Sequence, residues 1–215
     1  MVGIFDSGVG GHNSLRELRR ICDRVDAVYL ADYKNAPYGT KTKKELIPII
    51  SDNVKMLLSL GCERVLIACC TASAMLDDLT PELRERSAGV ILPTLDEVRR
   101  SGARRVAVIA TERTVDEGAF SALSDVCELV QIKAQPLVSI VERGNTDSPY
   151  VGLLINRIKE LSLDGLILGC THFSHLLERF SGELSGVRIF SPAHIGAREF
   201  CKTVNNFGEG RIKYI

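Results

Sequence analysis

The sequence predicts an α/β fold with two similar lobes, in which helices flank parallel sheets and the functional site lies in the cleft between the lobes. Three observations predict this fold. Short apolar runs alternate with longer amphipathic segments along the whole chain, which is typical of parallel sheets covered by helices on both faces. Two apolar runs, one in each half of the chain, end in Cys-Thr at residues 70–71 and 170–171. Two others lead into hydroxyl-bearing turns at Ser7 and Thr111.

The apolar runs are the predicted strands, and the amphipathic segments are the predicted helices. In chain order the strands are Val2–Phe5, Ala27–Ala31, Arg64–Ala68, Gly89–Leu92, Arg105–Ile109, Leu129–Lys133, Gly165–Leu168 and Val187–Phe190. The helices are Ser14–Cys22, Val54–Leu60, Leu95–Arg100, Val115–Leu123, Val151–Leu161 and Ala193–Val204.

Several helix ends carry local signals. Ser148 before Pro149 is typical of an N-cap followed by proline at the first helical position. Gly61 is placed to end a helix as a left-handed cap. Thr42 with Glu45 resembles a capping box, and Pro48 follows closely enough that we expect a kink or a restart there.

The two halves of the chain look related, so we expect two lobes whose strand C-termini line a shared cleft. We expect residues 1–93 with 190–215 to form the first α/β lobe, and residues 94–189 to form the second. Chance similarity between buried strands is the alternative explanation of the repeat. The length of 215 residues is enough for a substantial core under either arrangement.

Composition narrows the class of protein. Apolar residues make up 45% and charged residues 25%, which is ordinary for a globular protein. Lys+Arg and Asp+Glu balance at 27 each, so we expect no nucleic-acid partner and no membrane partner. No apolar run approaches the ~20 residues of a membrane span, and we expect no signal peptide. The seven irregularly spaced cysteines favour reduced thiols and a cytoplasmic location.

A glycine-rich turn follows the first strand, in the segment Phe5-Asp6-Ser7-Gly8-Val9-Gly10-Gly11. Backbone N–H groups of such a turn can bind phosphate at a helix N-terminus. The spacing matches neither a dinucleotide-binding fingerprint nor a P-loop. Asp6 and Ser7, at the mouth of the strand, are better interpreted as groups that contact a small polar ligand.

The strand-end thiols are the main candidates for chemistry: Cys69 or Cys70 in the first half, and Cys170 in the second. A helix N-terminus lowers the pKa of a thiol, and the thiolate is the reactive form. Two thiols that approach one substrate from opposite sides suit the transfer of a proton between two faces of a carbon. The alternative is that they are small buried hydrophobic residues, which we expect for the remaining cysteines. These are Cys22, Cys62, Cys127 and Cys201.

Two further residues are candidates with structural alternatives. His172 follows the second Cys-Thr pair closely enough to orient Cys170 or share its proton, although an isolated histidine is more often structural. Glu142 ends an apolar stretch, and taken alone it is better explained as helical surface. We expect no metal site, because no C-x-x-C occurs and His172 with His175 gives too few ligands.

Taken together, these segments resemble those of the glutamate racemases of the cofactor-independent aspartate/glutamate racemase superfamily, over nearly the whole chain and in the same order. The matching segments are Gly3–Gly11, Pro37-Tyr38-Gly39, Ala68–Ser73, Ile109–Glu112 with Thr114, Pro136–Glu142 and Gly169-Cys170-Thr171-His172.

The resemblance implies a proton transfer at the α-carbon of glutamate that needs no PLP or other cofactor, supplies D-glutamate for peptidoglycan and takes place in a homodimer. One cysteine thiolate removes the α-proton while the opposite thiol delivers a proton to the other face. Asp6 would assist the first-lobe cysteine, and His172 with Glu142 the second. The substrate-binding residues would be Asp6, Ser7, Pro37, Tyr38, Gly39, Cys70, Thr71, Thr114, Thr171 and His172.

The chain departs from the family pattern in three places. Cys69-Cys70-Thr71 stands where the family has Cys-Asn-Thr, which replaces an amide by a thiol and leaves two candidates for the catalytic cysteine. The family alignment favours Cys69, whereas a repeat offset of one hundred residues favours Cys70, and we expect Cys69. Phe173-Ser174-His175 replaces the usual Tyr-Pro-Leu, and the chain is somewhat shorter than typical members.

Two alternative functions remain open at this point. The first is another member of the superfamily, such as an aspartate racemase or a related decarboxylase that retains one working thiol. The second is a catalytically silent protein that holds an acidic ligand in the cleft. Retention of both thiols argues against the second, because a binder needs hydroxyls and cations and not paired thiols.

Overall fold

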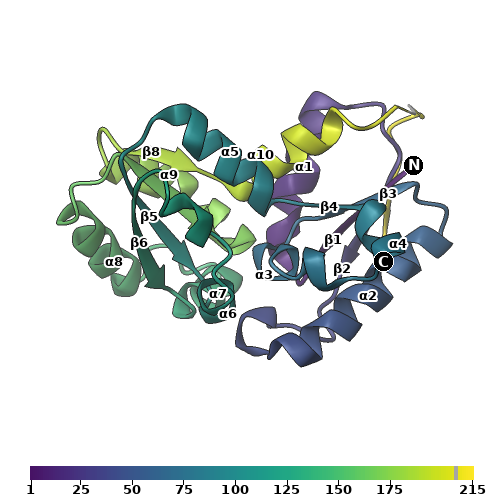
Figure 1. Cartoon of the computed structure of the whole chain (residues 1–215), viewed down its shortest axis with the longest axis horizontal. Coiled ribbons are helices and arrows are strands. Elements are labelled where there is room, and N and C mark those ends of the chain that lie inside the picture. Colours follow the sequence, from purple (N-terminus) through teal and green to yellow (C-terminus); the bar gives the residue numbers. More distant parts are fainter. Residues whose placement is uncertain (206–207) are drawn as a thin grey trace.

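Two parallel sheets, one in each lobe, organise the chain (Figure 1). The computed structural model describes residues 1–205 and 208–215. The first sheet has the order β4-β3-β1-β2-β9, with bounds β1 Val2–Asp6, β2 Ala27–Ala31, β3 Arg64–Ile67, β4 Ser87–Gly89 and β9 Ile212–Tyr214. The second has the order β6-β5-β7-β8, with bounds β5 Arg105–Ala110, β6 Glu128–Lys133, β7 Gly165–Gly169 and β8 Arg188–Phe190.

The same topology occurs twice. Read from β4 the first sheet runs β4-β3-β1-β2, and read from β8 the second runs β8-β7-β5-β6. Helices lie on both faces of each sheet, and the residues of β1 and β7 are buried throughout, as parallel strands covered on both sides must be. The predicted α/β fold with two similar lobes is therefore confirmed. The predicted residue limits of the lobes stay a prediction.

Helices and short 3-10 turns fill the connections between strands. The helices are α1 His12–Ile21, α2 Lys43–Ser59, α3 Cys70–Ser73, α4 Pro81–Glu85, α5 Ile91–Ser101, α6 Glu112–Asp116, α7 Pro136–Glu142, α8 Pro149–Lys159, α9 Leu177–Glu183 and α10 Pro192–Cys201. The 3-10 turns are η1 Val9–Gly11, η2 Tyr38–Thr40, η3 Leu76–Asp78, η4 Ser121–Leu123 and η5 Thr171–Leu176. Among the described residues, no helix has the length and apolar character needed to cross a membrane.

Local signals predicted three helix ends correctly and one helix interruption wrongly. The capping box is present, because the Glu45 N–H donates to Thr42 Oγ1 (3.4 Å) and the Thr42 N–H donates to the Glu45 carboxylate (2.7 Å). The expected restart at Pro48 is wrong: α2 continues through it, and its exposed position lets water satisfy the freed carbonyl. Gly61 has φ +90°, as a left-handed cap requires, and Ser148 is the N-cap of α8.

Further assignments differ from the structure. The predicted helix Val54–Leu60 is only the C-terminal part of α2, which begins at Lys43, and α4, α7 and α9 were not predicted. The predicted strand Gly89–Leu92 is wrong beyond Gly89, because Ile91 begins α5 and its apolar residues face the core at helical spacing. The predicted helix Val115–Leu123 divides into α6 and η4, since Gly118 between them has φ +64°. β9 was not predicted, because a strand of three residues after a glycine-rich stretch has too little pattern to detect.

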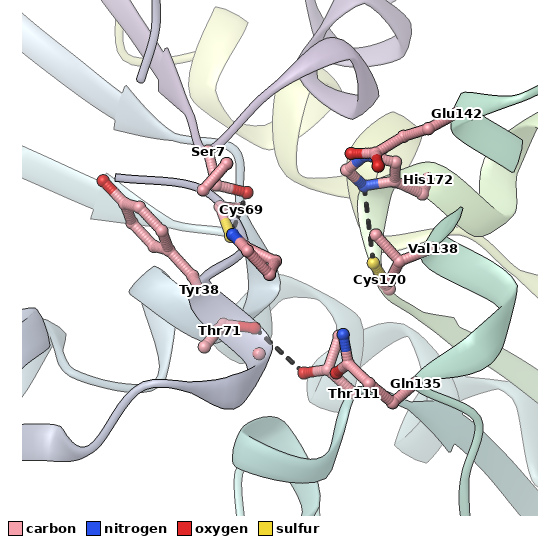
Figure 2. A pocket seen from close by; sticks show the side chains of 13 residues that line it. Ser7, Tyr38, Cys69, Thr71, Thr111, Gln135, Val138, Glu142, Cys170 and His172 are labelled. Atoms are coloured by element: carbon pink, nitrogen blue, oxygen red, sulfur yellow. Dashed lines mark hydrogen bonds and ion pairs between the residues drawn. The ribbon is translucent and has the colours of Figure 1, made fainter. Parts of the chain in front are cut away.

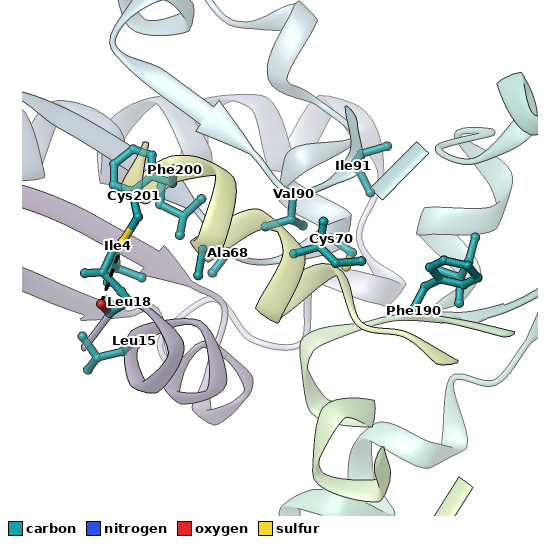
Figure 3. Close-up of a cluster of buried hydrophobic side chains, with 14 of the residues drawn as sticks. Ile4, Leu15, Leu18, Ala68, Cys70, Val90, Ile91, Phe190, Phe200 and Cys201 are labelled. Carbon is teal, nitrogen blue, oxygen red and sulfur yellow. Dashed lines mark hydrogen bonds between the residues drawn. The ribbon is translucent and has the colours of Figure 1, made fainter. Parts of the chain in front are cut away.

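One hydrophobic cluster extends across both lobes (Figure 3). It includes Ile4 of β1 and Ile167 of β7, together with apolar residues of α5 and α10. Figure 1 shows these two helices side by side between the sheets. The lobes therefore share part of their core on one side, while the opposite side is free to form a cleft.

Two cysteines differ from expectation. Cys22 at the end of α1 and Cys201 at the end of α10 form a disulfide, so the expectation of reduced thiols is wrong for this pair. The physical reason is that the two helices pack against each other and end together, with the two Cα atoms 6.4 Å apart. The described cysteines outside this pair are free.

Candidate active site

A cavity of about 20 Å³ lies between the lobes, at the C-terminal ends of the strands (Figure 2). Most of the predicted site residues line it: Ser7, Pro37, Tyr38, Gly39, Cys69, Thr71, Glu142, Cys170 and His172. The volume is close to that needed for one water molecule, so the lobes are closed around a space smaller than an amino acid. An outer cavity of about 490 Å³ adjoins it and shares the lining residues Pro37, Gln135, Val138 and Glu142.

Cys69 forms one wall of the cavity. It follows β3 as the N-cap of α3, and its Sγ lies 3.5 Å from Ser7 Oγ. Burial, followed by the nearby Asp6 carboxylate, raises the pKa of the Cys69 thiol to about 11, although the Ser7 hydroxyl and the α3 N–H groups oppose this rise. At neutral pH this buried sulfur is therefore a protonated thiol.

Cys170 forms the opposite wall (Figure 2). It follows β7, and its Sγ lies 3.7 Å from His172 Nδ1. On the far side of the ring, His172 Nε2 lies 3.1 Å from Glu142 Oε1. Burial raises the pKa of the Cys170 thiol well above its usual value. This chain of contacts gives Cys170 an adjacent imidazole that can orient the sulfur or exchange a proton with it.

The strand register identifies which first-lobe cysteine corresponds to Cys170. The sequence repeat equates Phe5 of β1 with Ile109 of β5. Phe5 pairs with the residue two positions before Cys69, and Ile109 pairs with the residue two positions before Cys170. Cys69 and Cys170 therefore occupy equivalent positions in the two halves.

Cys70 is directed away from the cavity. It is 1% exposed and lies in the apolar cluster with Ala68, Val90 and Ile91, as Figure 3 shows. Cys70, predicted to bind substrate, does not line the cavity, because its side chain packs in this apolar cluster.

Asp6, Thr171 and Thr114 lie behind the cavity wall. Asp6 is fully buried, and it accepts hydrogen bonds from the Gly8 N–H (3.0 Å) and from Thr171 Oγ1 (3.1 Å) of the other lobe. Burial raises the pKa of Asp6, and the charge of His172 partly opposes this. Thr114 Oγ1 lies 3.0 Å from Thr71 Oγ1. These side chains link the lobes in the closed state.

Tyr38 lines the cavity, but its hydroxyl is bonded elsewhere. Its hydroxyl donates to Asp32 (2.6 Å) and accepts from Asn53 (3.0 Å), so it is directed into a buried network on the far side. Burial and the Asp32 carboxylate raise the pKa of this phenol, which therefore stays neutral. The turn that includes Pro37 and Gly39 is thus fixed from behind.

Four residues line the cavity without having been predicted: Ala36, Thr111, Gln135 and Val138. Gln135, Val138 and Glu142 follow helical spacing and form one face at the start, middle and end of α7. The sequence signal for Thr111 was its position directly after a predicted strand. In the structure its side chain caps α6 by accepting from the Thr114 N–H (3.3 Å). Gln135 carried no such signal, because its position depends on how α7 packs across the cleft.

Two glycines let the lobes approach closely. A Cβ at Gly10 would collide with the Thr171 side chain and the His172 backbone, and one at Gly39 would collide with Gln135 and Thr111. Each glycine belongs to one lobe and each neighbour to the other. The glycine-rich turn of the first lobe is therefore a contact between lobes and not an open phosphate cradle.

We expect Gly10→Ala to destabilise the closed state by about 1–3 kcal/mol, because the added methyl group must displace η5. The free energy of urea unfolding and the KM for substrate measure this effect. Gly182→Ala is the matched control, since nothing lies within 4 Å of its added Cβ. Equal stability and KM for the Gly10→Ala and control variants would contradict the close contact.

The chain is similar to proteins of a known family. The model of the Asp/Glu/Hydantoin racemase family matches residues 14–200. A glutamate racemase of Aquifex aeolicus is 34% identical over 219 residues, which cover 99% of this chain and 86% of that protein. A glutamate racemase of Thermus thermophilus is 36% identical over 225 residues, with coverage of 100% and 86%.

A solved structure agrees with these sequence matches. The crystal structure of glutamate racemase from Thermus thermophilus in complex with β-chloro-D-alanine superposes with a TM-score of 0.85 at 32% identity, and it covers 99% of this chain and 86% of that one. Since the family model and the relatives extend over nearly the whole sequence, the chain belongs to the Asp/Glu/Hydantoin racemase family and is an amino-acid racemase, an isomerase.

Proposed function

We propose that this protein is a glutamate racemase that interconverts L- and D-glutamate by proton transfer between two cysteines, without a cofactor. The observation that supports it most strongly is that Cys69 and Cys170, equivalent in the repeat, line opposite walls of one cavity. The relatives with 34–36% identity over nearly the full chain bear the name glutamate racemase.

In the proposed reaction one cysteine is a thiolate and the other a thiol. The thiolate takes the α-proton and becomes a thiol, while the opposite thiol gives its proton to the other face of the α-carbon and becomes a thiolate. His172, held by Glu142, assists Cys170. Ser7 favours the Cys69 thiolate, and the Asp6 carboxylate makes that thiolate a stronger base. The reverse reaction exchanges the two roles.

The site must stabilise negative charge at the α-carbon with its own groups. The ammonium group of the substrate would lower the raised thiol pKa values by its positive charge. Ser7, the backbone of Pro37–Gly39, Thr71, Thr114 and Thr171 are the proposed ligands of its polar groups. The threonines bond to each other or to Asp6 in the closed site, so substrate must replace these contacts. A small, closed cavity strengthens such interactions because it excludes water.

We further propose that the product D-glutamate is used for peptidoglycan, that the enzyme acts in the cytoplasm and that it forms a homodimer. These three statements rest on the resemblance to glutamate racemases. Analytical ultracentrifugation of the purified protein measures the oligomeric state, and a monomer at micromolar concentration would contradict the last of them.

One experiment tests the proposed reaction. The protein is incubated with L-glutamate, and separately with L-aspartate, in D2O without added PLP. We expect optical rotation to decay and deuterium to enter the α-position with glutamate. Activity with aspartate alone would identify an aspartate racemase, a decarboxylated product would identify a decarboxylase, and binding without exchange would identify a silent binding protein.

The raised thiol pKa predicts a pH dependence. A base must lose its proton before it acts, and the Cys69 pKa of about 11 places this loss above neutral pH. We expect kcat/KM to rise with pH between about pH 7 and 8.5, approaching tenfold per pH unit. Initial rates in both directions across this range measure it. A flat or falling profile would show that the free enzyme already holds a thiolate.

A further inference from the structure

The carboxylates of the proposed substrate need partners in the cavity. Of the 13 described residues that line it, none is Lys or Arg. Apart from His172, the groups that can hold carboxylates are then neutral hydrogen-bond donors, whose number and direction decide which substrate fits. Several hydroxyls are already engaged, since Tyr38 donates to Asp32, and Thr71 and Thr111 lie 3.0 Å apart.

Gln135 is the side-chain amide among these lining residues, and its Oε1 is unsatisfied. The oxygen is buried and has no hydrogen-bond partner among the described residues. It lies against Gly39 of the other lobe, where an added Cβ would collide with it. Figure 2 shows the amide beside Thr111 with its nitrogen directed into the space between the walls. The NH₂ group, which faces this space, can donate to a ligand that enters it, whereas the oxygen beside Gly39 is an acceptor.

The position of Gln135 in the cavity limits which group of the substrate it can contact. It lines the same small inner cavity as both cysteine sulfurs, which must both reach the α-carbon. The groups within this short range are the substituents of the α-carbon itself, an ammonium and a carboxylate. The NH₂ group is a donor, and it suits the carboxylate.

We infer that Gln135 binds the α-carboxylate of the substrate through its side-chain NH₂ group, and that closure of the lobes brings this contact into place. This inference rests on the proposed function. It assigns to the N-cap of α7 in the second lobe an amide donor that the lining residues of the first lobe lack. It also explains why Gly39, against which the amide packs, has no side chain.

A direct test uses the wild-type protein. The chain contains two glutamines, Gln131 and Gln135, so selective ¹⁵N-glutamine labelling gives two side-chain amide signals in an NMR spectrum. Gln131 is exposed on β6 and lies outside the cavity, which makes it an internal control. We expect D-glutamate to shift the Gln135 signal and to leave that of Gln131 unchanged, with the Gln131→Leu variant providing the assignment.

Kinetics of matched variants test the same contact. We expect Gln135→Leu to lower kcat/KM for glutamate about ten- to a hundredfold, the usual result of losing a hydrogen bond to a charged group. Gln135→Glu should lower it further, because two carboxylates then face each other, and Gln131→Leu should leave it unchanged. The thermal midpoint of each variant confirms that it folds.

The outcomes separate this inference from the proposed function. If the wild-type protein shows no α-deuterium exchange with glutamate, the proposed function is wrong. Exchange in the wild type, combined with an unshifted Gln135 signal or with Gln135→Leu within twofold of wild type, overturns the role of Gln135 alone. A Gln135→Glu variant more active than Gln135→Leu would assign the amide to the ammonium group and overturn the carboxylate contact.

Discussion

Cys69→Ser is expected to lower the rate of racemisation by about 10²–10⁴-fold, because a serine hydroxyl is too weak an acid to form the base that a thiolate provides. Cys70→Ser is expected to retain much of the activity, since Cys70 lies in the apolar cluster and does not line the cavity. Initial rates of optical rotation change with both enantiomers measure the difference.

The Cys69 and Cys70 variants control for each other, because they differ by one position in the same motif. Cys70→Ser places a hydroxyl in an apolar environment, and about 1–3 kcal/mol of unfolding free energy is the expected cost. Cys70→Ala separates this loss of stability from any loss of chemistry. The reverse pattern, with Cys70→Ser inactive and folded, would transfer the catalytic role to Cys70.

Cys170→Ser is expected to abolish racemisation and yet to retain exchange of the α-proton in one enantiomer. The remaining thiol can remove a proton from the face it meets and return a deuteron to that same face, whereas no acid stands on the other side. Cys69→Ser should exchange the opposite enantiomer by the same logic. Proton NMR of L- and D-glutamate in D2O, recorded separately, distinguishes the two variants.

Two results would contradict this assignment of one face to each sulfur. Racemisation by Cys170→Ser at a rate near that of wild type would show that a single thiol suffices. Exchange of the same enantiomer by both variants would show that the two sulfurs do not stand on opposite faces. Cys127→Ser is the control, because this free cysteine lies outside the cavity.

The repeat and the strand positions followed from the sequence because parallel strands buried on both faces leave a clear apolar pattern. That pattern also explains the main error, since the apolar run near Ile91 fits the first turn of a buried helix equally well. The Cys22–Cys201 pair was not foreseen, because it depends on how α1 and α10 end together across a long stretch of sequence.

The site was predictable where a residue follows a strand directly, as with Ser7, Cys69 and Cys170, since parallel strands bring their C-termini to one edge. It was less predictable where tertiary packing decides the direction of a side chain. The Tyr38 hydroxyl turns away to Asp32, whereas the Gln135 amide turns inward. Neither direction is encoded in the local sequence.

The two sulfurs have unlike surroundings, with an imidazole beside Cys170 and a hydroxyl beside Cys69. Thermodynamics limits how far this difference can affect the rates in the two directions. Mirror-image solutes have equal free energies in an achiral solvent, so their equilibrium constant is unity. The Haldane relation then forces the specificity constants of the forward and reverse directions to be identical, in the wild type and in every variant. The asymmetry of the protein therefore emerges only as turnover numbers and Michaelis constants that differ between the enantiomers by one common factor.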